Sequence, residues 1–149
     1  MSYIIKNSLE RLGMDSYGEE DPVCILSIST PLRKAKHIEN AIDAMNVFSV
    51  DTVISIEEEF SPCYQHSRFG LTSLNISGEG EPRLERNAMY KYNGAILLTR
   101  LKIIHQGKLH GQKVGHITML PEESVKINSN YEYWLAEQLI LKNREDHSK

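Results

Sequence analysis

The stretch that most constrains the fold is residues 22–56, where two short apolar runs flank a helical stripe. The first run, Val23-Cys24-Ile25-Leu26-Ser27-Ile28, has the character of a buried strand of the parallel type. The second, Asp51-Thr-Val-Ile-Ser-Ile56, is rich in the β-branched residues that favour strands. Between them apolar residues recur at helical spacing: Ile38, Ala41, Ile42 and Met45. Strand, helix and strand with short connections predict a βαβ crossover.

The remaining pattern extends this unit on both sides. A helix over 3–12, ending at Gly13, precedes the first strand, and a helix over 99–106 stops at Gly107. The other expected elements are a strand over 89–98 entered through a bend at Asn93-Gly94, a strand over 114–120, an extended piece over 124–128 and a helix over 130–141. The fold class is therefore α/β, an incomplete doubly wound and mostly parallel sheet. A chain that begins on a helix looks as if it starts in the middle of such a fold.

Three local expectations accompany this framework. Residues 57–86 are polar and irregular, with Gly70–Ile76 as one strand of a hairpin arm. Glu57-Glu-Glu59 could hold a cation, but a solvated loop is the preferred interpretation. The terminal helix is capped by Asn130 and followed by a frayed charged tail over 143–149. Its core-facing residues are Tyr131, Trp134, Leu135 and Leu139.

Composition excludes several classes of protein. The 149 residues hold 17 basic and 20 acidic side chains, so the net charge of −3 offers no footprint for nucleic acid and no polybasic membrane anchor. No apolar run is long enough to cross a bilayer, and the N-terminus does not resemble a signal peptide. Cys24 is interpreted as a small core residue. The two cysteines, Cys24 and Cys63, do not suggest a disulfide framework. The expected location is cytoplasmic.

Four segments, in order, resemble the acylneuraminate (CMP-sialic acid synthetase-like) cytidylyltransferase family. Ile25-Leu-Ser-Ile-Ser-Thr-Pro-Leu-Arg33 is similar to the family's Leu-Leu-Gln-Pro-Thr-Ser-Pro-Leu-Arg. Arg83 ahead of Tyr90-Lys-Tyr-Asn-Gly-Ala-Ile96 resembles an Arg ahead of Tyr-x-x-Asn-Gly-Ala-Ile. Gly107-Lys-Leu-His-Gly111, leading into Met119-Leu-Pro121, is the third match. Ser124-Val-Lys-Ile-Asn128, followed by Leu135-Ala-Glu137, resembles Ser-Ile-Asp-Ile-Asp and Leu-Ala-Glu.

The resemblance implies a fold and a reaction. It implies a three-layer αβα fold of the nucleotide-diphospho-sugar transferase type, with residues 1–149 as its C-terminal part, lacking the N-terminal CTP-binding segment. The family transfers CMP from CTP to a nine-carbon 2-keto sugar acid with magnesium. Its members are dimers in which an inserted arm completes the partner's site, and here that β-hairpin dimerisation insert would occupy about 60–90.

The chain departs from the family where the chemistry is most demanding. The family's triphosphate cradle is a Gly/Lys/Arg-rich loop after its first strand, and no such loop exists here; Gly78-Glu-Gly-Glu81 carries the wrong charge. The two metal carboxylates fall on Lys126 and Asn128, and an ammonium 4 Å from Mg²⁺ would oppose it by about 8 kcal/mol at an effective dielectric near 20. We therefore assign no catalytic residue and expect the chain to bind no magnesium.

Four residues remain as candidates for the ancestral sugar-acid pocket: Ser27, Arg33, Arg83 and Asn93. An arginine could pair with the sugar carboxylate, although a solvated or structural arginine is an equal alternative. Asn93-Gly94 is also interpretable as a backbone bend, and Ser27 replaces the family's glutamine. The six histidines and the Cys63/His66 pair form no recognisable metal spacing.

Three functional hypotheses follow. The chain is a fragment of a sugar-acid cytidylyltransferase that transfers CMP only if a second chain supplies the missing parts. Alternatively it is a non-catalytic dimerisation or sugar-acid-binding module, a homodimer or a partner of a full-length synthetase. The third possibility is a decayed or split gene product that folds as a swapped dimer. All three predict a dimer or a larger assembly, since an unpaired sheet edge and helix face would be exposed.

Overall fold

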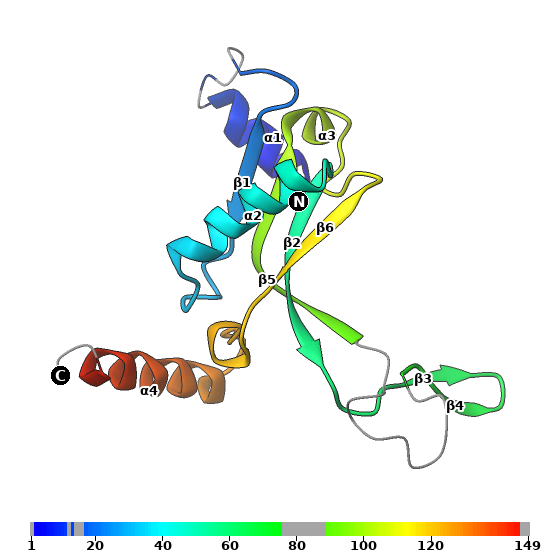
Figure 1. Cartoon of the computed structure of the whole chain (residues 1–149), viewed down its shortest axis with the longest axis vertical. Coiled ribbons are helices and arrows are strands. Elements are labelled where there is room, and N and C mark those ends of the chain that lie inside the picture. The colour runs from blue at the N-terminus through cyan, green and yellow to red at the C-terminus, as the bar shows by residue number, and fades with distance from the viewer. Residues whose placement is uncertain (1, 12, 14–16, 76–88, 147–149) are drawn as a thin grey trace.

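A four-stranded mixed sheet forms the body of the protein in the computed structural model, which describes residues 2–11, 13, 17–75 and 89–146. The strand order is β1 (Pro22–Leu26), β5 (Met89–Arg100), β2 (Thr52–Glu59) and β6 (Val114–Thr118). β2 pairs with β6 in parallel, whereas β5 runs antiparallel to both β1 and β2. The α/β class is confirmed, with β1, β2 and β6 pointing the same way (Figure 1).

The expectation of a mostly parallel sheet was wrong about its pairings. β5 lies between β1 and β2, so the only parallel neighbours in the described part of the chain are β2 and β6. The reason is the route of the chain, since the end of β2 pairs with the start of β5, Glu59 opposite Met89. A strand that returns by a hairpin-like connection runs antiparallel, and only a crossover gives a parallel partner. The crossover β1–α2–β2 is present as predicted.

The main core lies between α2 (Ala35–Val47) and one face of the sheet. Ala41 and Met45 on the helix are buried, and they meet residues from three strands. The buried residues on the strands are Val53, Ala95, Ile96, Leu98 and Ile117, and buried Met119 directly follows β6. Ile38, Ala41 and Met45 of the predicted helical stripe thus face the apolar positions of the strands, whereas Ile42, predicted on the same stripe, is 39% exposed.

A second apolar cluster joins α1 (Ser2–Arg11) to α3 (Leu101–His105). Leu9 packs with Leu101 and Ile104, and Ile5 and Val23 pack against them. α3 is shorter than the expected helix over 99–106 because Thr99 and Arg100 remain in β5. The helix ends where predicted: Gly107 has φ +74°, and its N–H donates to the carbonyl of Ile104 at 2.9 Å.

Cys24 is exposed, which corrects its assignment to the core. β1 pairs with β5 on one side only, and its side chains alternate between half-buried Val23 and Ile25 and exposed neighbours. An apolar run on an edge strand alternates in this way, whereas a strand buried on both faces does not.

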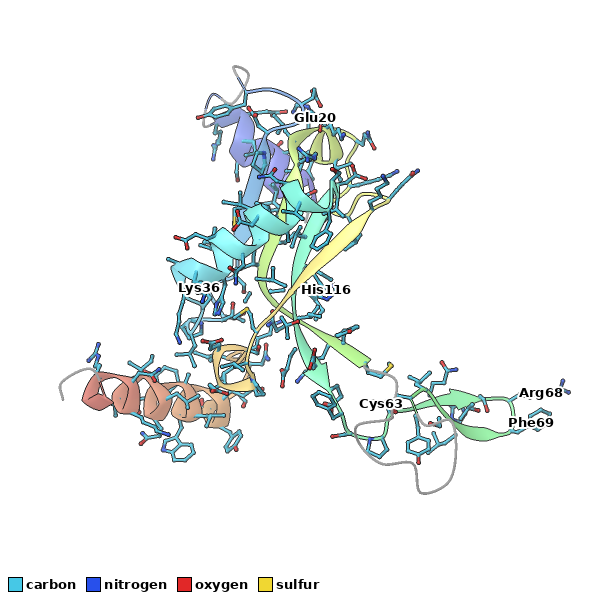
Figure 2. All side chains as sticks on the ribbon, viewed as in Figure 1. Glu20, Lys36, Cys63, Arg68, Phe69 and His116 are labelled. Carbon is cyan, nitrogen blue, oxygen red and sulfur yellow. The ribbon has the colours of Figure 1, made fainter. Side chains whose placement is uncertain are left out.

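Two projections leave the lower end of the sheet in Figure 1. One is a two-stranded hairpin of β3 (Tyr64–Ser67) and β4 (Gly70–Ser73), and the other is α4 (Asn130–Asp146). The hairpin strand ends at Ser73 rather than Ile76, which lies outside the described residues, and Glu57-Glu-Glu59 belongs to β2 rather than to a loop. Figure 2 shows Arg68 and Phe69 at the tip of the hairpin, pointing away from the body.

α4 differs from its prediction in three ways. It continues to Asp146, so residues 143–146 are helical; residues 147–149 of the expected tail lie outside the described residues. Tyr131 and Trp134 are 67% and 53% exposed, so they do not face a core. The side-chain cap is Ser129 rather than Asn130, because the Ser129 hydroxyl accepts from the N–H of Glu132 at 3.4 Å. Across the described ranges, none of the helices offers the length and apolar character that a bilayer crossing requires.

Candidate functional site

A cavity of about 360 Å³ opens where the first half of β5 faces the segment that follows β6. This segment comprises the short 3-10 helix η3 (Pro121–Glu123), residues 124–129 and the first turns of α4. Polar side chains from both sides line the cavity: Tyr92, Asn93, Ser124, Lys126, Asn128 and Tyr131. The cavity lies past the carboxyl end of β6 and beside Glu57 in the last part of β2, close to the usual position of ligand sites in α/β sheets.

Asn93 occupies a bulge in β5 that the sequence predicted as a bend at Asn93-Gly94. Opposite β2, the register jumps from Ile54–Leu97 to Ile56–Tyr92, and Gly94 has φ +72°. Residues 93–96 thus face the single residue Ser55, which fits a bulge with glycine in the left-handed region.

The Asn93 amide is 4% exposed and fully occupied by its neighbours. Its Oδ1 accepts from Ser55 Oγ at 2.5 Å and from the Ala95 N–H at 3.0 Å. Its Nδ2 donates to Ser124 Oγ at 2.9 Å. The amide therefore joins the bulge to β2 and to the segment after η3, and this arrangement shapes one wall of the cavity.

Lys126 and Asn128, the two residues that the resemblance aligned with carboxylates, lie on the opposite wall. A methyl group on Gly94 would be 4.0 Å from Lys126 Nζ and 3.9 Å from the ring of Tyr92, which places the ammonium against the bulge. Asn128 Nδ2 donates to the carbonyl of Lys126 at 3.3 Å, and the Asn128 N–H donates to Glu132 at 2.7 Å. That backbone hydrogen bond holds the pKa of Glu132 below its usual value.

Ser27 and Arg33 lie in the loop after β1, which contacts the same segment. Arg33 folds back, and its Nη1 donates to the carbonyl oxygens of Ser27 and, at 2.9 Å, Thr30. The Ile127 N–H donates to the carbonyl of Ser29 at 2.8 Å, which places this loop beside residues 124–128. Ser27 Oγ shares a hydrogen bond with Ser29 Oγ at 2.8 Å. Arg83 lies outside the described residues.

Glu123 braces this segment against α2, a role that the sequence interpretation missed. Its carboxylate contacts Lys34 Nζ at 2.7 Å and His37 Nε2 at 3.2 Å. His37 Nδ1 accepts the Lys34 N–H at 3.1 Å, so the ring proton lies on Nε2 and points to Glu123. A histidine at the third helical position was the available signal, because a side chain there can reach back to the helix start.

The pKa of Glu123 is lowered overall. Burial raises this pKa, but the hydrogen bonds from Lys34 and from the Leu120 N–H, with the electrostatic influence of His37 and Lys34, outweigh burial. A carboxyl group with a lowered pKa in the folded state stabilises the fold fully above its unfolded pKa. That contribution disappears as the pH falls through the lower, folded value.

We expect Glu123→Gln to lower the free energy of unfolding by about 2 kcal/mol at pH 7, the scale of hydrogen bonds to a charged group. The wild type should lose stability below about pH 4.5, while the variant should lose less. Urea unfolding of both proteins at pH 7 and pH 3.5 tests this, with the exposed Glu122→Gln as matched control. Equal stability of wild type and Glu123→Gln at pH 7 would contradict the brace.

The other acidic and histidine-containing candidates do not form a metal centre. Within the described ranges, no three side chains of His, Cys, Asp or Glu come close enough to hold an ion together. Cys63 lies at the base of the hairpin (Figure 2), where its N–H donates to Asn75 Oδ1 at 2.8 Å. The run Glu57-Glu-Glu59 lines a second cavity of about 520 Å³ beside Phe60 and Leu120, and Glu57 pairs with Lys91 at 3.7 Å.

Comparison with known proteins identifies a distant relative. The chain is 25% identical over 129 residues to N-acylneuraminate cytidylyltransferase A from Danio rerio. The alignment covers 83% of this chain but only 30% of that protein. No family model matches the sequence. The similarity supports a CMP-sialic acid synthetase-like relationship at the level of the family.

Proposed function

We propose that this chain carries the sugar-acid side of an acylneuraminate cytidylyltransferase-type site and does not transfer CMP by itself. One observation carries the proposal: segments that resemble the family separately meet at one cavity, which the second, third and fourth line and the first adjoins. Asn93 from the second segment bonds Ser124 from the fourth, and Ile127 of the fourth bonds Ser29 of the first. Residues far apart in the sequence, from Ser29 to Ile127, thus meet at one site only because of the fold.

The family's magnesium does not fit the residues that line this cavity. Lys126 brings a positive charge where a carboxylate would be required, and it offers no ligand atom. Asn128 offers one neutral oxygen, and Glu57 is paired with Lys91. Phosphoryl chemistry needs donors for the triphosphate and a cation to neutralise it, and the sequence supplies no loop of the required kind. We therefore propose sugar-acid recognition without nucleotide activation for this polypeptide.

Incubation of the purified chain with CTP, magnesium and N-acetylneuraminic acid should yield no CMP-sugar. The same protein should melt at a higher temperature with the sugar acid and not with CTP, because a ligand stabilises the state that binds it. Chromatographic detection of CMP-sugar, together with a thermal scan, is the measurement. Formation of CMP-sugar by the chain alone would refute the proposal.

A second candidate is a non-catalytic dimerisation module, favoured by the two projections. Phe69 and Leu71 on the hairpin are 93% and 72% exposed, and Tyr131, Tyr133 and Trp134 are exposed on α4. Large apolar side chains gathered on projecting elements are typical of surfaces that contact another chain. Sedimentation of the same preparation separates the candidates: a dimer that shows no thermal shift with sugar acid would favour this second function.

A further inference from the structure

We infer that the Lys126 ammonium replaces a divalent cation in this cavity, so that the cavity binds a small oxyanion, a carboxylate or a phosphate, directly. This binding mode extends the proposed function and rests on it. The proposed function is also the reason for choosing a sugar acid as the first probe. In this arrangement Lys126 supplies the charge that holds the ligand, and binding requires no metal ion.

The distribution of charge around the cavity supports this assignment. Four charged side chains line it: Glu57, Lys91, Lys126 and Glu132. Glu57 and Lys91 pair with each other at 3.7 Å, and Glu132 accepts the Asn128 N–H at 2.7 Å. Within the described ranges, no carboxylate lies within 4.0 Å of Lys126 Nζ. Lys126 is thus the one lining cation whose charge the described residues leave unpaired.

The side chain of Lys126 is exposed, and its ammonium end lies where a ligand in the cavity can meet it. Its Nζ lies against the bulge at Gly94, where the absence of a side chain leaves room beside the ring of Tyr92. The bulge is itself fixed by the buried Asn93, Ser55 and Ser124 contacts. An ammonium over a rigid, glycine-lined wall is the arrangement that a small anion can approach closely.

Neutral donors beside Lys126 suit the hydroxyl groups of a polyhydroxylated acid. Ser124 Oγ already accepts from Asn93, so its own proton is free to be donated into the cavity. The phenol of Tyr92 also lines the cavity and is protonated at neutral pH, so it can donate a hydrogen bond; burial raises its pKa further. The cavity volume of about 360 Å³ falls at the small end of the roughly 300–1,000 Å³ typical of ligand pockets.

Calorimetric titration with N-acetylneuraminic acid and, separately, with inorganic phosphate tests the inference. Each titration is run with EDTA and with magnesium, and the methyl ester of the sugar acid serves as the ligand without a carboxylate charge. We expect binding that is indifferent to magnesium. Lys126→Met should weaken it about tenfold, the loss expected for one charge-assisted contact, and Lys126→Arg should restore most of it. Lys36→Met, which removes an exposed lysine of α2, is the matched control and should bind as the wild type does.

The outcomes separate this inference from the proposed function. If the sugar acid binds Lys126→Met as tightly as wild type, or binds only with magnesium, the inference is overturned while sugar-acid recognition stands. If phosphate binds through Lys126 and the sugar acid does not, the oxyanion site stands and the proposed function fails. If neither anion binds the wild type, the inference is overturned. Retained binding of the methyl ester would also count against a role for the carboxylate.

Discussion

Asn93→Ala should lower the free energy of unfolding by about 3 kcal/mol. The substitution leaves the Ala95 N–H and Ser124 Oγ without their shared partner in a buried position, and Ser55 Oγ keeps only its hydrogen bonds with the Ile96 backbone. Each buried polar group left without a partner costs about 1–3 kcal/mol, and relaxation of the bulge recovers part of the sum. Urea unfolding followed by circular dichroism gives the value, and an unchanged dependence on urea concentration would show that the compactness of both states is retained.

Asn128→Ala is the matched control, because this exposed amide lines the same cavity and donates only one hydrogen bond, at 3.3 Å. It should change stability by about 0.5 kcal/mol or less. An Asn93→Ala protein as stable as the wild type would mean that the buried network does not stabilise the fold. Loss of sugar-acid binding without loss of stability would instead assign Asn93 a direct contact with the ligand.

Local signals predicted the backbone of this site well. The Asn-Gly pair marked the bulge, because glycine adopts the positive φ found at Gly94 without strain. The helical stripe of α2 and the two flanking strands gave the crossover, since both periodicities are properties of short segments. These features depend on residues that are close together in the chain, so a single sequence is enough to predict them.

The predictions that were wrong concern residues whose surroundings depend on contacts with distant parts of the chain. Cys24 was assigned to a core because its segment is apolar, but burial requires neighbours on both sides, and among the described residues β1 has β5 as its single partner strand. Tyr131 and Trp134 were placed in a core for the same reason, and α4 leaves them exposed. The antiparallel direction of β5 follows from how the chain returns after residues 60–88, which no periodicity within β5 records.

The candidate site shows the same division. Asn93, Lys126 and Asn128 were singled out by resemblance, and the fold brings all three to one cavity. Arg33 bonds its own loop and is not among the residues lining that cavity. Glu123 escaped notice because its importance comes from Lys34 and His37, nearly ninety residues earlier. The residue types in a sequence indicate the chemistry of a site. The contacts that position those residues are visible only in the tertiary structure.

Gly111 belongs to a segment that resembles the family, and the structure gives a physical reason for a glycine there. A Cβ at this position would lie 2.3 Å from the Cβ of Asp51, far inside van der Waals contact. The surrounding backbone has little freedom to move: the Gly111 N–H donates to Thr52 Oγ1 at 2.9 Å, and the Asp51 N–H donates to the Lys113 carbonyl at 3.0 Å. These contacts connect the loop before β6 to the start of β2, its parallel partner.

Gly111→Ala should therefore lower the free energy of unfolding by about 3 kcal/mol, at the upper end of the usual cost of overpacking. Gly18→Ala is the control, because its Cβ would meet nothing closer than 3.7 Å and should be nearly neutral. Asp51→Gly removes the atom that is struck, so the double variant Gly111→Ala/Asp51→Gly should be more stable than the sum of the single effects predicts. Strict additivity in this thermodynamic cycle, measured by urea unfolding, would show that the two positions do not touch and that the loop packs differently from the arrangement described.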